Sequence, residues 1–164
     1  MTSHCLRPTT IALAAVAALV LLPSTAGATT TVSYASSTGL RLQGDGAGEG
    51  VSAVFNFDGF FEVRPLAGTI PGATLVAGSG CQRAGANVTC ARGDNIVITA
   101  NLGEGADLFT RPGSAILDTF INGGGGNDQL QGGVGADSID GGPGGDQLSG
   151  GDNLTSTASD GHAG

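Results

Sequence analysis

Short runs that alternate between apolar and polar residues follow residue 28, and none of them has helical spacing. The runs 51–57 and 60–64 flank Asp58-Gly59, a pair that is typical of hairpin turns because a two-residue turn needs positive φ. Four of the six phenylalanines lie between residues 55 and 61, so we expect this hairpin to anchor the core. Further short strands are expected at residues 31–34, 40–43, 87–90 and 95–102.

The second half of the chain contains a nine-residue repeat in three successive frames that begin at residues 123, 132 and 141. Glycine fills repeat positions one, two and four, aspartate fills position six, and a large aliphatic residue fills position eight. Glycine richness alone would not hold an acid and an aliphatic residue in fixed phase. The residues at positions one, two, four and six are Gly123, Gly124, Gly126 and Asp128; Gly132, Gly133, Gly135 and Asp137; and Gly141, Gly142, Gly144 and Asp146.

A weaker frame begins at Leu102 and places Asp107 at position six. The first perfect frame begins 21 residues after Leu102, which is three residues more than two frames. This spacing indicates an enlarged coil at residues 111–122. Position eight then predicts an inward-facing apolar column, made of Phe109, Ile121, Leu130, Ile139 and Leu148.

These residue types suit a calcium ion. Turns that point several carbonyls at one ion need backbone angles that glycine adopts readily. Calcium prefers six to eight oxygen ligands, which carbonyls and one carboxylate per turn can provide. Such short strands bury little apolar surface, so we expect the ion to hold the stack together and metal binding to be coupled to folding.

This repeat resembles the hemolysin-type calcium-binding repeat, also called the RTX nonapeptide, a pattern that binds calcium in parallel β-helical stacks. The resemblance covers residues 123–149 closely and 102–154 more loosely. It implies a parallel β-roll in which successive turns alternate between two edges. The preceding region, about 29–101, is more loosely similar to the N-terminal parts of secreted actinobacterial repeat proteins of this kind.

If turns alternate, one edge carries the loops 102–107, 123–128 and 141–146, and we predict about two calcium sites there. The other edge carries 111–119, 132–137 and an imperfect loop at 150–155, so we predict a poorer third site at Asp137. The alternative is that these aspartates only form turns and bind no ion.

Residues 1–28 are typical of a secretory signal peptide, since a twelve-residue apolar run ends at Pro23 and is followed by small residues. This run is shorter than the roughly 20 residues that span a bilayer, and an uncleaved membrane anchor is the alternative. Cys81 and Cys90 remain after cleavage, and an even number in an exported protein favours a disulfide.

Charge is distributed unevenly along the chain. Residues 94–164 carry ten acids against Arg111 alone, and the whole chain has no lysine. Such a surface disfavours nucleic acid and anionic membranes and attracts multivalent cations, although a solvated disordered tail would have the same charge.

We find no sequence signature of an enzyme. His162 is the one histidine after residue 28, and neither an HExxH nor a GxSxG motif occurs. We therefore expect a secreted, monomeric, non-enzymatic calcium-binding protein; the alternative is a calcium-stabilised surface or adhesion module with a protein partner. The expected fold is all-β: a signal peptide at 1–28, an antiparallel β region at 29–101 containing the Cys81–Cys90 disulfide, a parallel β-roll at 102–154 and a disordered tail at 155–164.

Overall fold

Strands connected by glycine-rich turns make up the computed structural model, which describes residues 27–56, 59–66, 73–91, 96–151 and 157–160. The expected signal peptide lies outside the described residues except for Gly27 and Ala28. No helix occurs within the described ranges, so the all-β expectation is confirmed for them. The strands are β1 Thr29–Ala35, β2 Gly39–Gln43, β3 Gly50–Asn56, β4 Phe60–Pro65, β5 Thr74–Ala77, β6 Cys81–Ala84, β7 Asn87–Ala91, β8 Ile98–Glu104, β9 Leu108–Thr110, β10 Thr119–Gly125, β11 Gln129–Gln131, β12 Ser138–Gly142, β13 Gln147–Ser149 and β14 Thr157–Asp160.

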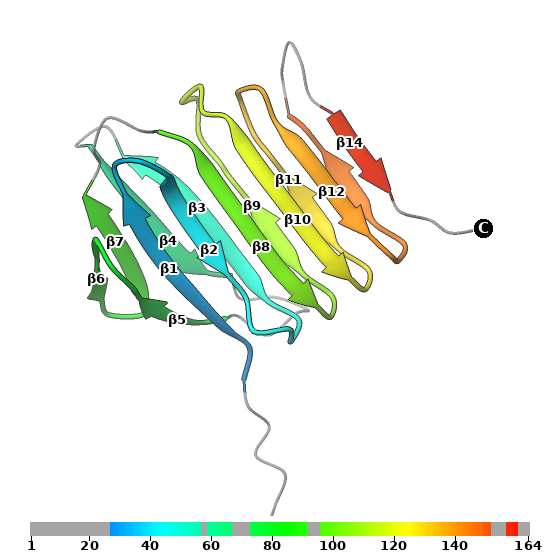
Figure 1. The fold of residues 1–164 in the computed structure, drawn as a ribbon, viewed down its shortest axis with the longest axis horizontal. Helices are drawn as coiled ribbons and strands as arrows, with labels where there is room; N and C mark the ends of the chain where they lie inside the picture. Colours follow the sequence, from blue (N-terminus) through cyan, green and yellow to red (C-terminus); the bar gives the residue numbers. More distant parts are fainter. Residues whose placement is uncertain (1–26, 57–58, 67–72, 92–95, 152–156, 161–164) are drawn as a thin grey trace, which may run out of the picture.

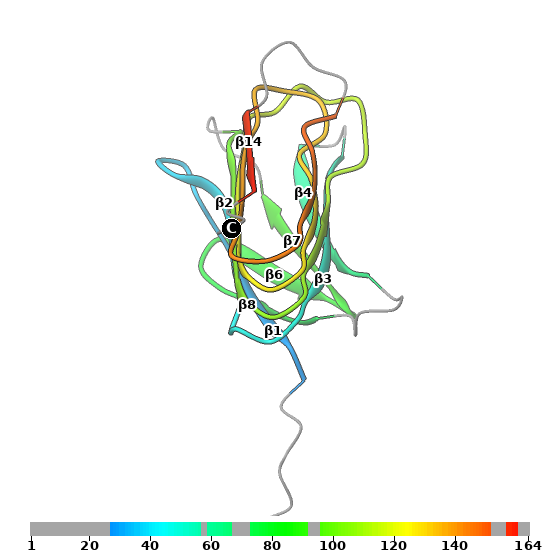
Figure 2. The same cartoon turned by 90° about the vertical axis from the view of Figure 1, so that its right-hand side faces the viewer.

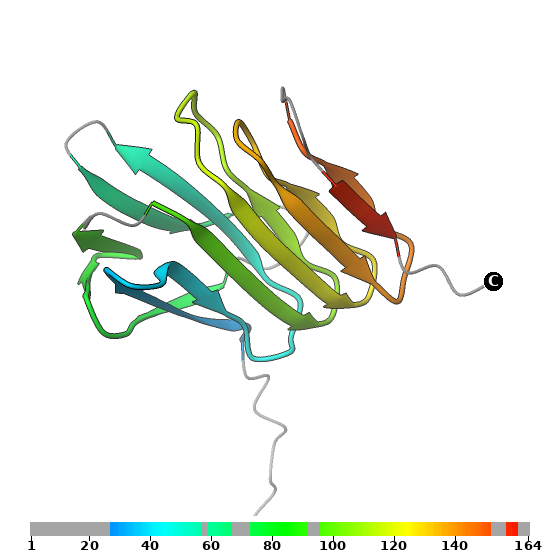
Figure 3. The same ribbon diagram turned by 45° about the horizontal axis from the view of Figure 1, so that its top comes forward.

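These strands form two seven-stranded sheets that face each other (Figure 2). Sheet A has the order β14-β12-β10-β8-β2-β1-β5, and sheet B has the order β13-β11-β9-β3-β4-β7-β6. From β8 onward the chain crosses between the sheets at every turn, so successive coils stack along the molecule (Figures 1 and 3).

Both sheets are mixed and run through both halves of the chain, so the strands do not divide as the sequence predicted into an antiparallel region and a parallel region. β2 pairs in parallel with β8, and β3 pairs in parallel with β9. The reason is that the turn at 44–49 carries the chain from sheet A to sheet B, as the turn at 105–107 does. Antiparallel pairing is found for β1 with β2, β3 with β4, β4 with β7 and β6 with β7.

The predicted hairpin is formed by β3 and β4, whose register pairs Asn56 with Phe60. The connection therefore has three residues, one more than the sequence suggested, and two of them lie outside the described ranges. Gly59 supplies the expected positive φ, at 82°. Phe61 is fully buried in the core, as expected for an anchoring hairpin, whereas Phe60 is 45% exposed on the other face of the strand.

Cys81 and Cys90 form the expected disulfide. They lie directly opposite each other on β6 and β7, with Cα atoms 4.1 Å apart. β6 was not predicted as a strand, although the two-residue turn before β7 contains Gly85 with φ at 67°. This hairpin forms one end of sheet B.

One end of sheet A is formed by β14, which pairs in parallel with β12. This strand lies in the segment 155–164 that the sequence predicted to be disordered. Without β14, the outer side of β12 would leave backbone N–H and C=O groups unpaired, and such a strand edge favours the addition of a further strand.

The inward-facing column expected from repeat position eight is present between the sheets. Phe109, Ile121, Leu130 and Ile139 are buried, and Leu148 is partly buried at the end of the stack. These residues come alternately from the two sheets: Leu130 pairs with Leu148 in sheet B, and Ile121 pairs with Ile139 in sheet A. The apolar interior is therefore continuous across both halves of the chain.

Leu130→Ala and Leu148→Ala make the same substitution at the middle and at the end of this column. We expect Leu130→Ala to lower the free energy of unfolding by about 2–5 kcal/mol, because it leaves a cavity in a packed interior. We expect a smaller loss for Leu148→Ala, which is only partly buried. Urea unfolding of both variants under identical ionic conditions measures the difference, and equal losses would contradict this description of the core.

Candidate functional site

Four turns lie one above another along what we call the first edge, where strands of sheet A continue into sheet B. They are the turns 44–49, 102–107, 123–128 and 141–146. The registers of the flanking strands keep repeat position six in line, because Leu108 pairs with Gln129, and Gln129 with Gln147. Asp107, Asp128 and Asp146, each one residue before these strands, therefore form a column.

Glycine is required where these turns stack. Gly126, at repeat position four, has φ at 137°, and a Cβ on it would overlap the carbonyl of Gly105 in the preceding turn. Gly144 stands in the same relation to the carbonyl of Gly126. The repeat glycines thus bring successive turns into close contact and direct their carbonyls into the edge.

A hydrogen bond links each acid of the column to the turn before it. Asp107 N–H donates to Asp128 Oδ1 at 2.8 Å, and Asp128 N–H donates to Asp146 Oδ1 at 2.9 Å. Asp107 Oδ1 in turn accepts the N–H of Glu49 at 2.7 Å. Every acid therefore uses one oxygen to hold the preceding turn.

Glu49 extends the column by one turn into the N-terminal half, and the sequence analysis missed it. Its Oε1 accepts the N–H of Asp45 at 2.9 Å, and its side chain is fully buried. A Cβ on Gly44 would overlap Glu49 Oε2, as a Cβ on Gly123 would overlap Asp128 Oδ2. A signal was present, because Gly44 and Glu49 have the spacing of repeat positions one and six, and Val51 follows at position eight.

The second carboxylate oxygen of each acid is buried without a hydrogen-bond partner among the described residues. The atoms are Glu49 Oε2, Asp107 Oδ2, Asp128 Oδ2 and Asp146 Oδ2 on the first edge, and Asp137 Oδ2 on the opposite one. Buried charged oxygens without a partner are strongly unfavourable. The geometry therefore calls for a proton or a cation beside each of them.

Burial raises the pKa of Glu49 and of Asp107 to about 7 each, from ordinary values of 4.5 and 3.8. The neighbouring carboxylates add to this effect. Burial also raises the pKa of Asp128, with a further contribution from Asp146. Two like charges one strand spacing apart, ~4.8 Å, repel by roughly 3–4 kcal/mol at an effective dielectric constant of about 20. A row of ionised acids is therefore unstable unless positive charge is added.

The second edge, where strands of sheet B continue into sheet A, is built differently. It contains the predicted residues Gly132, Gly133, Gly135 and Asp137, so the structure separates them from the other predicted site residues. Asp137 Oδ1 accepts the N–H of Thr119 at 3.1 Å. Burial raises the pKa of Asp137, and the positive charge of the buried Arg111 partly opposes this shift.

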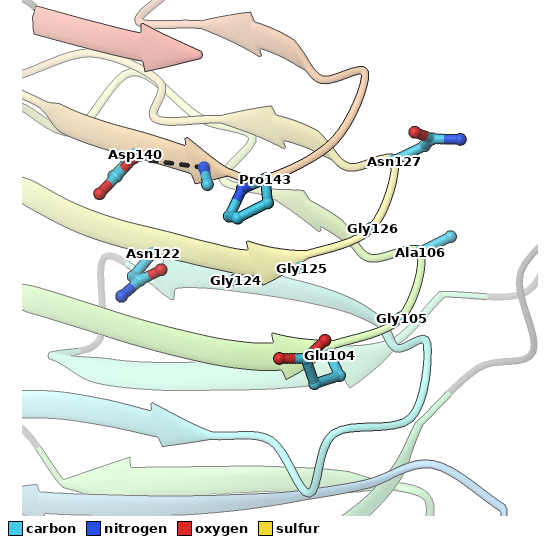
Figure 4. Close-up of a pocket in the computed structure, with 11 residues that line it drawn as sticks. Glu104, Gly105, Ala106, Asn122, Gly124, Gly125, Gly126, Asn127, Asp140 and Pro143 are labelled. Atoms are coloured by element: carbon cyan, nitrogen blue, oxygen red, sulfur yellow. Dashed lines mark hydrogen bonds between the residues drawn. The ribbon is translucent and has the colours of Figure 1, made fainter. Parts of the chain in front are cut away.

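The remaining predicted residues come together on the first edge: Asp107, Gly123, Gly124, Gly126, Asp128, Gly141, Gly142, Gly144 and Asp146. A groove of about 820 Å³ lies on the outer surface of sheet A and of the first-edge turns that follow it (Figure 4). Glu104, Asn122 and Asp140 line it, and their side chains are exposed, unlike those of the buried column. The groove and the column are thus on different sides of the same turns.

Within the described ranges, no group of three or more His, Cys, Asp or Glu side chains is arranged to hold a metal ion. A site on the first edge would therefore depend on turn carbonyls, with one or two carboxylates from neighbouring turns. Oxygen donors of this kind suit hard cations such as calcium.

Comparisons with protein-family models, curated proteins and solved structures found no match to this chain. Among the described residues, no helix has the length and apolar character needed to cross a membrane.

The raised pKa values predict how stability depends on pH in protein freed of divalent cations on a chelating resin. Between about pH 4 and pH 7 the folded state binds more protons than the unfolded state, so its stability falls as pH rises. We expect a higher melting temperature at pH 5 than at pH 8. Asp107→Asn should flatten this dependence, because an amide keeps the hydrogen bond to Glu49 N–H but does not titrate. Stability that is constant or increases from pH 5 to pH 8 would contradict the prediction.

Proposed function

We propose that this protein binds calcium ions along the first edge and that these ions complete its fold. The observation that carries the proposal is the column of Glu49, Asp107, Asp128 and Asp146, whose second oxygens are buried and have no hydrogen-bond partner in the part of the chain that the structure describes. Protonation would satisfy Glu49 and Asp107 only below their pKa values of about 7. A divalent cation between successive turns satisfies them at neutral pH and also offsets the repulsion along the row.

The donor set favours calcium over other metals. Carboxylate and carbonyl oxygens surround the intervals between the turns, and the chain's two histidines, His4 and His162, lie far from these turns in sequence. Zinc favours nitrogen and sulfur ligands, whereas calcium accepts six to eight oxygens in flexible geometry. Magnesium needs a nearly ideal octahedron and usually retains several waters, which fits less well with closely packed turn carbonyls.

Stacking of four turns leaves three intervals on this edge, one more than the sequence suggested. The additional interval lies between the turns 44–49 and 102–107, with Glu49 and Asp107 on its two sides. In this proposal the N-terminal half supplies the first turn of the calcium row. The fold is then a β-roll extended by an N-terminal β region, in keeping with the resemblance of the repeat to the RTX nonapeptide.

Extracellular calcium would keep these sites occupied, which fits the expected signal peptide and the disulfide found between Cys81 and Cys90. Because the carboxylates repel one another without the ion, calcium binding and folding of the repeats should be coupled. We propose a secreted protein whose repeats are rigid in calcium and lose order in its absence.

Asp128→Asn tests the central acid of the column, and Asp140→Asn is its matched control. Asp128 is buried between two intervals, whereas Asp140 is exposed on the outer face of β12. We expect Asp128→Asn to weaken calcium binding at least about tenfold in calorimetric titration, since affinity follows the number of charged ligands. Asp140→Asn should bind like the unaltered protein.

Circular dichroism in calcium and after chelation gives the complementary measurement. The unaltered protein should gain β signal with calcium, and Asp128→Asn should need a higher calcium concentration for the same gain. A spectrum that does not respond to calcium, together with no heat of binding, would refute the proposed function.

Glu49→Gln tests whether the N-terminal half takes part. The amide can still accept the Asp45 N–H but removes the negative charge. We expect the calorimetric stoichiometry to fall by one ion, because only the interval beside Glu49 loses a charged ligand. Glu62→Gln is the control, since Glu62 pairs with Arg64 at 2.7 Å on β4, away from the turns. Unchanged stoichiometry in Glu49→Gln would remove the first interval from the calcium row.

A further inference from the structure

Arg111 is 2% exposed on the second edge, although arginine is almost never fully buried without partners. Its guanidinium is surrounded by oxygens. Nε donates to Gly132 O at 2.6 Å and to Thr119 Oγ1 at 3.1 Å, and Nη1 donates to Ala115 O at 3.0 Å. Nη2 donates to Leu117 O at 3.5 Å and to Val134 O.

The strand register shows which repeat position Arg111 occupies. A Cβ on Gly133 would meet the carbonyl of Arg111 at 2.7 Å, so the two turns are in close contact. Phe109 is at position eight and Thr110 pairs with Gln131 at position nine, so Arg111 begins its turn at position one. This turn therefore has arginine where the three perfect repeat frames have glycine.

The same turn also differs at positions four and six. Gly135 stacks on the carbonyl of Leu117, which places Leu117 at position four, so residues 112–116 contain three residues more than positions two and three require. Thr119 N–H donates to Asp137 Oδ1, as Asp128 N–H donates to Asp146 Oδ1, so Thr119 is at position six. Position six therefore has no acid, although the exposed Asp118 precedes it, and the turn has gained a cation.

The oxygens around the guanidinium come from two successive turns. Ala115 and Leu117 belong to the turn that contains Arg111, and Gly132 and Val134 belong to the next turn. Carbonyls of two adjacent turns that converge on one positive charge are the arrangement we propose for calcium on the first edge. Here the positive charge is attached to the chain.

We propose that Arg111 is a fixed cation that takes the place of a calcium ion between the turns 111–119 and 132–137. The second edge is then closed to calcium at this interval and holds its turns together without it. Asp137 is consequently not a calcium ligand in this interval while Arg111 is present. This inference rests on the proposed function. It assigns to the Arg111 guanidinium the role that calcium from solution has on the first edge.

Removing the side chain should expose a metal site. Arg111→Ala leaves the converging carbonyls and Asp137 without a cation, and alanine suits this backbone because no non-glycine described residue has positive φ. Arg41→Ala is the matched control, since Arg41 is exposed on β2 and its loss changes the net charge equally. Calorimetric calcium titration and thermal melting with and without calcium are measured for both variants and the unaltered protein.

We expect Arg111→Ala to bind one calcium ion more than Arg41→Ala. Its melting temperature without calcium should be lower than that of the control, and calcium should raise it by a larger amount. The inference is overturned if stoichiometry and calcium response match those of the control, or if Arg111→Ala remains unfolded at saturating calcium.

Arg111→Lys separates charge from packing. Lysine keeps a positive charge in the same space, so this variant should fold and bind the same number of ions as the unaltered protein. An additional ion in Arg111→Lys, or loss of folding equal to that of Arg111→Ala, would also overturn the inference. Absence of calcium binding by the unaltered protein would instead refute the proposed function, which keeps the two failures distinct.

Discussion

Asp107, Asp128 and Asp146 each use one carboxylate oxygen to accept a backbone N–H of the preceding turn, and this contact constrains the rest of the structure. It fixes the spacing of the turns, because the N–H of Asp107 donates to Asp128 Oδ1 in the next turn at 2.8 Å. It also places every acid inside the edge, where the second oxygen is removed from water. The hydrogen bonds that order the turns thus bring together carboxylates whose negative charge has to be neutralised.

The two edges meet this requirement in different ways. On the first edge the acids form a row from Glu49 to Asp146 with no described basic side chain beside them. On the second edge Thr119 replaces an acid and Arg111 brings a guanidinium into the turn. In the proposed function, the first edge takes its positive charge from ions in solution, whereas the second edge has a positive charge that belongs to the chain. The first edge alone would then respond to the calcium concentration.

The repeat made the second half of the fold predictable, because glycine, aspartate and an aliphatic residue in fixed phase specify both the turns and the inward column. Phe109, Ile121, Leu130 and Ile139 are buried as expected for this reason. Glu49 was missed because its turn has Asp45 and Ala47 at positions where the repeat has glycine. The parallel pairing of β2 with β8 joins residues 58 positions apart in sequence, and no local pattern shows such a contact. The position of Arg111 also depends on this stacking, so its sequence neighbours gave no indication of it.

The two ends of the stack are not equivalent. One end is finished by the β6–β7 hairpin with its covalent crosslink, whereas at the other end β13 is paired on only one side within the described residues. Each coil contacts mainly its immediate neighbours, so the coils form a stack along one axis. Further coils could be added at only one of its two ends. Duplication of two nine-residue repeats, eighteen residues, after Ser149 would lengthen the stack by one coil and leave the existing interior unchanged. The stack is crosslinked at the end formed by residues 81–91 and could be extended at the end formed by β13.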